Sequence, residues 1–157
     1  MKWNKMNIKK HINHILFKNG RIIDPFNQKS FKGSIWVKDG RIAGVGDFEI
    51  PNVDNIFIID CTNKIITHGF CDLHAHFREP GEDDKEDLGS GSRSALAGGF
   101  TRVCIMPNTK PPIDSPELVD FIIQTAKQSP IHIHPIGAVT KNQEGKLLTE
   151  MSLMHQK

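Results

Sequence analysis

Short apolar runs separated by turn-forming residues characterise the first part of the chain. Runs rich in Ile, Val and Phe favour β-strands, and the expected strands are residues 15–18, 21–23, 34–38, 41–43, 56–59 and 64–66. Asn19-Gly20 and Asp39-Gly40 separate neighbouring strands, and such pairs are typical of two-residue hairpins because both positions need a positive φ. The sequence therefore predicts a small antiparallel β module over residues 14–65, preceded by a disordered basic segment at residues 1–13.

After Thr67 the pattern changes to strands that alternate with helices. Strands are expected at residues 69–74, 101–106 and 131–136, with one helix at residues 85–97 and another from Pro116 onward. Ser115 is a favoured N-cap, and proline suits the first helical position. The second helix is expected to pack through the residues at helical spacing, which are Leu118, Phe121, Ile122 and Ala126. Strand–helix alternation predicts an α/β fold with a parallel sheet.

The length of the chain limits how much of such a fold it can contain. The chain has 157 residues, and a (β/α)₈ barrel needs about 250 residues, or about 31 for each βα unit. Residues 66–157 therefore suffice for only about three units. Three units do not close a barrel, so if the fold is such a barrel, most of it is absent from this sequence.

Composition and charge exclude several classes of protein. Lys plus Arg number 20 and Asp plus Glu number 18, for a net charge of +2, which argues against a nucleic-acid-binding protein with a strong basic excess. No apolar run approaches the ~18–20 residues of a membrane helix. Cys61, Cys71 and Cys104 form no C-x-x-C pair, which indicates free thiols in a reducing compartment. We expect a cytoplasmic protein without nucleic-acid or membrane partners.

Two closely spaced histidines are the first candidates for chemistry. His74 is the last residue of an expected strand and His76 lies two positions later, so in extended backbone both imidazoles should lie on one face, together with Asp72. Imidazole nitrogens suit zinc and related metals. A second H-x-H, His132-Ile133-His134, lies inside an apolar strand, where ordinary packing or hydrogen-bonding roles are the favoured interpretation.

Two polar residues near the ends of these strands could bind a substrate. Arg78 lies two positions after His76, so on a strand it would share the face of the histidines, and it could hold a carboxylate through two hydrogen bonds. Alternatively, it could form a surface salt bridge with a neighbouring acid. The four candidates are Glu79, Glu82, Asp83 and Asp84. Asn108 follows the second strand, and it could donate to a substrate oxygen or satisfy loop backbone. The sequence pattern leaves both pairs of alternatives open.

Several motifs in this region resemble those of one enzyme family. They are residues 69–81 (GFCDLHAHFREPG), 98–101 (GGFT), 106–109 (MPNT) and 135–140 (PIGAVT). Together they resemble dihydroorotase of the class I type common in bacteria, within the amidohydrolase superfamily. The REPG and MPNT elements are the specific part, since related allantoinases usually have NEPG. One departure is His68, where the family usually has proline.

The resemblance implies a fold and a set of site residues. The fold would be a metal-dependent amidohydrolase (β/α)₈ TIM barrel, preceded by part of a small β-sandwich that later residues complete. His74 and His76 would bind Zn²⁺, of which the complete subunit holds one or two, and His76, Arg78 and Asn108 would contact the substrate. The general-base Asp would lie beyond Lys157, so this chain alone is expected to be inactive.

The resemblance also implies a reaction and possible partners. The reaction would be the reversible cyclisation of N-carbamoyl-L-aspartate to (S)-dihydroorotate in de novo pyrimidine biosynthesis, by a protein that is a homo-oligomer at full length. One alternative is another cyclic-amide hydrolase, such as an allantoinase or hydantoinase. A second is a non-catalytic dihydroorotase-like subunit that scaffolds aspartate carbamoyltransferase.

Overall fold

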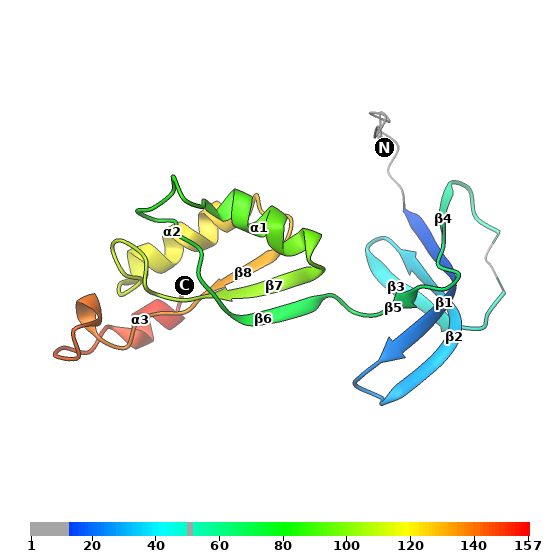
Figure 1. Ribbon diagram of the computed structural model, residues 1–157, viewed down its shortest axis with the longest axis horizontal. Helices are drawn as coiled ribbons and strands as arrows, with labels where there is room; N and C mark the ends of the chain where they lie inside the picture. Colours follow the sequence, from blue (N-terminus) through cyan, green and yellow to red (C-terminus); the bar gives the residue numbers. More distant parts are fainter. Residues whose placement is uncertain (1–12, 50–51) are drawn as a thin grey trace. The chain divides into compact units, whose positions relative to one another are not determined.

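The computed structural model describes residues 13–49 and 52–157, and the chain divides into two compact units, residues 1–68 and 69–157 (Figure 1). The division falls after His68, because strand β5 (Ile65–Ile66) pairs with β1 inside the first unit. The disordered segment expected at residues 1–13 lies, except for Asn13, outside the described residues.

The first unit contains one mixed β-sheet. Its other strands are β1 (His14–Asp24), β2 (Lys29–Lys38), β3 (Arg41–Gly46) and β4 (Ile56–Asp60), in the order β3-β2-β1-β4. The pairs β1–β2 and β2–β3 are antiparallel, whereas β4 and β5 both run parallel to β1. The prediction of a purely antiparallel module is therefore wrong.

The two turn-like dipeptides of this unit behave differently. Asp39-Gly40, with φ of 49° and 73°, forms the expected turn between β2 and β3. Asn19-Gly20 does not form a hairpin, because it lies inside β1 at a break in the register with β2. There the backbone N–H of Cys61 donates to Lys18 O (2.8 Å). The positive φ at Asn19 thus forms a β-bulge. Before the bulge β1 pairs with β4, and after it the same edge of β1 pairs with β5.

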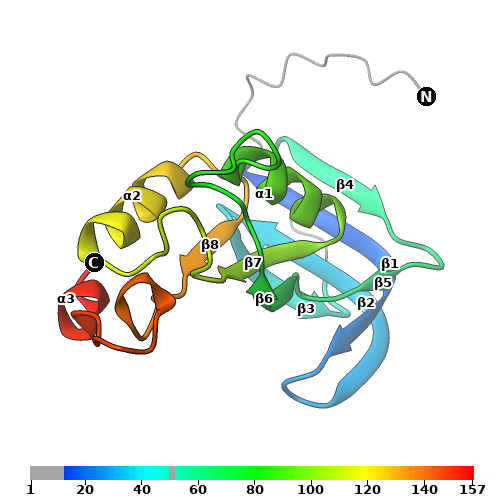
Figure 2. The same ribbon diagram turned by 60° about the vertical axis from the view of Figure 1, so that its left-hand side comes forward.

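The second unit is a parallel α/β layer. It contains β6 (Phe70–Ala75), α1 (Leu88–Ala97), β7 (Phe100–Ile105), α2 (Pro116–Ala126) and β8 (His132–Pro135), followed by the 3₁₀ turn η1 (Lys141–Gln143) and α3 (Met151–His155). The strand order is β6-β7-β8 with both pairs parallel. Figure 2 shows α1 and α2 on the same side of this sheet. The predicted strand–helix alternation is confirmed.

Local capping explains where the two helices begin. α1 begins at Leu88 rather than at residue 85, because Asp87 is its N-cap and accepts the N–H of Ser90. α2 begins as predicted, with Ser115 as N-cap and proline in the first turn. Its buried face differs from the expected one, since Phe121 is 43% exposed.

The core of the second unit lies between the sheet and its helices. Strand residues Val103, Ile105 and Ile133 pack with helix residues that include Leu88 and Ile122. Helices therefore cover one face of the sheet, and the strand ends remain available for polar side chains. Among residues 13–49 and 52–157, no helix is both long and apolar enough to cross a membrane.

Candidate active site

The two histidines of the H-x-H motif converge at the carboxyl end of β6. His74 Nε2 and His76 Nε2 lie 3.1 Å apart, and both side chains are exposed. Their ring centroids are 4.9 Å apart, with an edge-to-face orientation. The imidazole nitrogens thus approach one another at the strand end where α/β barrels place their active sites.

The separation of these nitrogens suits a shared metal ion. Zinc–nitrogen bonds of about 2.0–2.1 Å at the tetrahedral angle place two ligand nitrogens about 3.3 Å apart. The observed 3.1 Å between the two Nε2 atoms is close to that value. Within the part of the chain that the structure describes, no group of three or more His, Cys, Asp or Glu side chains could hold a metal. Two nitrogens at this separation fit a zinc ion, but they supply only two of the three protein ligands that a catalytic zinc usually takes.

Asp72 does not share the face of the histidines, contrary to the expected alternation. Its side chain lines a cavity beside α1 together with Ala75, three positions later in the sequence. The pairing of β6 with β7 shifts register between these two residues. The Asp72 carboxylate accepts the backbone N–H of His74 at 3.0 Å. It therefore stabilises the irregular backbone from which the imidazoles project.

Asn108, from the loop after β7, contacts the histidine pair directly. Its Oδ1 lies 2.9 Å from His76 Nδ1. An amide oxygen can only accept, so His76 Nδ1 donates in this contact, and in the neutral ring the lone pair is then on Nε2. This tautomer presents to a metal the nitrogen that faces His74. The Asn108 amide nitrogen keeps two donors for another ligand.

Arg78 is half-buried at the start of the loop after β6. In the described residues its guanidinium makes no ion pair or side-chain hydrogen bond, and two of the neighbouring acids contact other groups. Glu79 Oε2 accepts the N–H of Leu88 at 2.7 Å. Glu82 contacts the amines of Lys85 and Lys110. The surface salt bridge that the sequence left open for Arg78 is therefore absent from this part of the chain.

Glu82 carries the largest electrostatic perturbation near these loops. Hydrogen bonds from Lys85 and then Lys110 lower the pKa of its carboxyl from 4.5 to about 2. The Lys110 Nζ lies 3.1 Å from Glu82 Oε1. Glu82 is therefore a carboxylate at any pH near neutrality and links two loops by charge.

The second H-x-H motif lies apart from this arrangement. Ile131 and Ile133 are buried, whereas His132 and His134 are exposed. Arg102 Nη1 lies 3.4 Å from His134 Nε2, in line with an ordinary hydrogen-bonding role.

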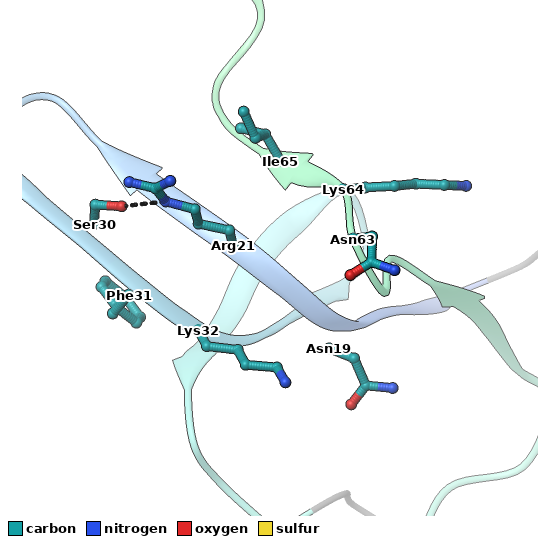
Figure 3. Close-up of a pocket in the computed structure, with 8 residues that line it drawn as sticks. All are labelled: Asn19, Arg21, Ser30, Phe31, Lys32, Asn63, Lys64 and Ile65. Carbon is teal, nitrogen blue, oxygen red and sulfur yellow. Dashed lines mark hydrogen bonds between the residues drawn. The ribbon is translucent and has the colours of Figure 1, made fainter.

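Sequence reasoning did not single out a cavity in the first unit. It has a volume of about 660 Å³ and is lined mainly by cationic and amide side chains, among them Arg21, Lys32, Lys64, Asn19 and Asn63 (Figure 3). Arg21 Nε donates to Ser30 Oγ at 2.9 Å. The lining residues are exposed, apart from the half-buried Phe31. None of the predicted site residues belongs to it.

Similar solved structures define the class of fold. An L-hydantoinase (dihydropyrimidinase) from Arthrobacter aurescens matches with a TM-score of 0.73 at 24% identity, over 90% of this chain and 30% of that chain. A D-hydantoinase matches with a TM-score of 0.63 at 21% identity, over 82% of this chain and 28% of that chain. The fold is that of the amidohydrolase enzymes, and the expected start of a TIM barrel after a partial β-sandwich is confirmed.

Relatives that are similar in sequence identify the family within this class of fold. A family model described as "Dihydro-orotase-like" matches residues 63–157. A dihydroorotase of Caldicellulosiruptor saccharolyticus is 43% identical over 143 residues, which cover 90% of this chain and 33% of that protein. A dihydroorotase of Clostridium botulinum is 45% identical over 139 residues, 88% of this chain and 34% of that protein. The chain belongs to the dihydroorotase-like family, and it spans about one third of the length of these relatives.

Proposed function

We propose that this chain forms part of a zinc-dependent dihydroorotase, which interconverts N-carbamoyl-L-aspartate and (S)-dihydroorotate. The observation that carries the proposal is the convergence of His74 and His76, 3.1 Å apart at their Nε2 atoms, with Asn108 on one of them. This arrangement lies inside the segment that matches the family. The relatives' names support the activity, which the proposal extends to this protein.

Each site residue has a distinct role in this proposal. His74 and His76 would hold zinc through their Nε2 atoms, and His76 would also contact the substrate. Zinc, when bound, would lower the pKa of water toward neutrality and polarise a carbonyl oxygen. The Arg78 guanidinium would hold the substrate carboxylate through two hydrogen bonds. Asn108 would donate its amide N–H to the same carboxylate while its oxygen orients His76.

Ring closure and opening also require a group that moves a proton. The resemblance implies a general-base Asp and further metal ligands beyond Lys157, which would complete the set begun by the two histidines. The partial sandwich of the first unit would likewise be completed by later residues. These elements belong to the proposal for the full-length protein.

The proposal includes a cellular setting. The reaction would serve de novo pyrimidine biosynthesis in the cytoplasm, and the unpaired Cys61, Cys71 and Cys104 suit a reducing compartment. The full-length protein would be a homo-oligomer and could associate with aspartate carbamoyltransferase. The names of the relatives favour a catalytic dihydroorotase over an allantoinase or a non-catalytic scaffold.

A substrate panel on the full-length protein tests the proposal. The purified zinc-loaded protein is incubated with carbamoyl-aspartate, dihydroorotate, allantoin and hydantoin, and each product is measured. We expect turnover of the first two compounds only, and its loss when a chelator removes zinc. Preference for allantoin or hydantoin would replace the proposed substrate, and a zinc-loaded protein without turnover of any of them would contradict the proposed activity.

A further inference from the structure

Two loops carry the proposed substrate-binding residues. The first loop, residues 76–87, joins β6 to α1 and contains Arg78; the second loop, residues 106–115, joins β7 to α2 and contains Asn108. The two loops are in direct contact. The backbone N–H of Lys110 donates to Pro80 O at 3.0 Å. One loop therefore cannot shift without breaking a backbone hydrogen bond to the other.

Gly81 lies where the first loop packs directly against the backbone of Lys110. Its φ is +99°, a conformation that side chains disfavour, and a Cβ built there would lie 1.9 Å from Lys110 O and 2.7 Å from Lys110 C. Both obstacles are backbone atoms, so they could yield only if the second loop moved. A residue without a side chain is thus required for the loops to pack at this distance.

A charged contact reinforces the same junction. Lys110 Nζ lies 3.1 Å from Glu82 Oε1, and the amine of Lys85 contacts the same oxygen. Each loop is also tied to regular structure. Glu79 Oε2 accepts the N–H of Leu88 at the start of α1, and the N–H of Met106 donates to Ala75 O at 2.8 Å. The junction therefore connects two anchored segments.

We propose that Gly81, Glu82 and Lys110 form a clamp that sets the separation of Arg78 and Asn108 and so positions both for one carboxylate ligand. This inference rests on the proposed function. Arg78 precedes Gly81 by three residues, and Asn108 precedes Lys110 by two. A bidentate guanidinium contact tolerates little change in geometry, and a displacement of about 1 Å can lower a rate about 100-fold. The clamp residues act through Arg78 and Asn108 and do not touch the substrate.

Gly81→Ala in the full-length protein tests the backbone part of the clamp, with Gly145→Ala as its matched control. Gly145 also has a positive φ, +72°, but a Cβ there meets nothing within 4 Å. We expect Gly81→Ala to lower kcat/KM for carbamoyl-aspartate about 10- to 100-fold, chiefly through a higher KM because the clamp positions binding residues, with zinc content unchanged. Amide hydrogen exchange at Lys110 should become faster. Gly145→Ala should match the wild type in all of these measurements.

Glu82→Gln tests the charged part and covers the case in which Gly81→Ala fails to fold. Its control is Glu144→Gln, because Glu144 makes a similar exposed ion pair with Lys146 (3.0 Å) and neither residue belongs to the two loops. The contact is partly exposed, so we expect a KM increase of about two- to five-fold. Lys110→Met should give a similar increase, and Lys110→Arg should restore the wild-type KM.

The outcomes separate the clamp from the proposed function. An active wild type whose Gly81→Ala and Glu82→Gln variants keep its KM would overturn the clamp and leave the function intact. If Gly81→Ala does not fold, an unchanged KM in both Glu82→Gln and Lys110→Met would also overturn it. A zinc-loaded wild type without turnover of carbamoyl-aspartate would overturn the function and the substrate-positioning role with it.

Discussion

Replacement of Asn108 by Ala removes the oxygen that accepts from His76 Nδ1 at 2.9 Å. Without that acceptor, nothing in this contact keeps the proton on Nδ1 and the Nε2 lone pair toward His74. Partners of this kind typically contribute 10- to 100-fold to metal affinity, or about 1.4–2.7 kcal/mol. Asn108 and His76 are both exposed, so water can replace the lost acceptor. We therefore expect a loss near the lower value, about ten-fold in zinc affinity.

Asn108→Asp separates the two roles proposed for this residue. A carboxylate still accepts from His76 Nδ1, so zinc affinity should equal or exceed that of the wild type. The same carboxylate has no N–H to donate and repels a substrate carboxylate, so the KM for carbamoyl-aspartate should rise strongly. Asn108→Ala should impair both properties, whereas Asn108→Asp should impair substrate binding alone.

The assay uses full-length protein stripped of metal and titrated with zinc in competition with a chromogenic chelator. Kinetics on the zinc-loaded variants follow, with thermal melting to verify that each variant is folded. Wild-type zinc affinity in Asn108→Ala would refute the role of this hydrogen bond in preparing His76. A low KM in Asn108→Asp would refute the contact between Asn108 and the substrate carboxylate.

Three further predictions concern the same region. The double variant of His74 and His76 to Ala should lose bound zinc in the full-length protein, whereas the matched double variant of the 132–134 motif should retain it; equal zinc contents would remove the first pair from the site. Arg78→Lys should raise the KM or lower kcat markedly with little change in Tm, because lysine lacks the bidentate fork; near-wild-type kcat/KM would contradict this. The pKa of Glu82 is lowered from 4.5 to about 2, so the contribution of its charge to stability is complete above about pH 4.5 and disappears as the pH falls through about 2. The Tm difference between the wild type and Glu82→Gln should therefore shrink over that range. A Tm difference that stays constant would show that the Glu82 charge does not stabilise the fold.

Local signals account for the parts of the fold that were predicted correctly. Ser115 and Pro116 specify the start of α2 through contacts within one helical turn. The apolar runs that became β7 and β8 bury Val103, Ile105 and Ile133 under the helices. Such features depend on neighbours a few residues away, and the alternation of strand and helix then permits few arrangements other than a parallel sheet.

The errors arose where a local signal has more than one structural use. A positive φ at Asn19 suits a hairpin turn, but here it makes a bulge, because β1 can continue pairing with β4 and β5 along one edge. Strict alternation placed Asp72 beside the histidines, but a register shift against β7 redirects its side chain. Helical spacing predicted Phe121 in the core, whereas the orientation of α2 leaves it 43% exposed. Each outcome depends on packing against a distant segment.

The order of residues along the chain is enough to identify candidate residues for chemistry and the strand ends near which they lie. The spacing of His74 and His76 and the loop residues Arg78 and Asn108 were all recognisable from the order of the chain. Two contacts become visible only in the folded chain: Asn108 accepts from His76 across 32 residues, and Gly81 packs against Lys110. These contacts join loops from different strands, and their distances follow from how β6 and β7 pair and how the helices pack on them. Local sequence specifies each strand and helix, but the register and packing between them set the geometry of the site.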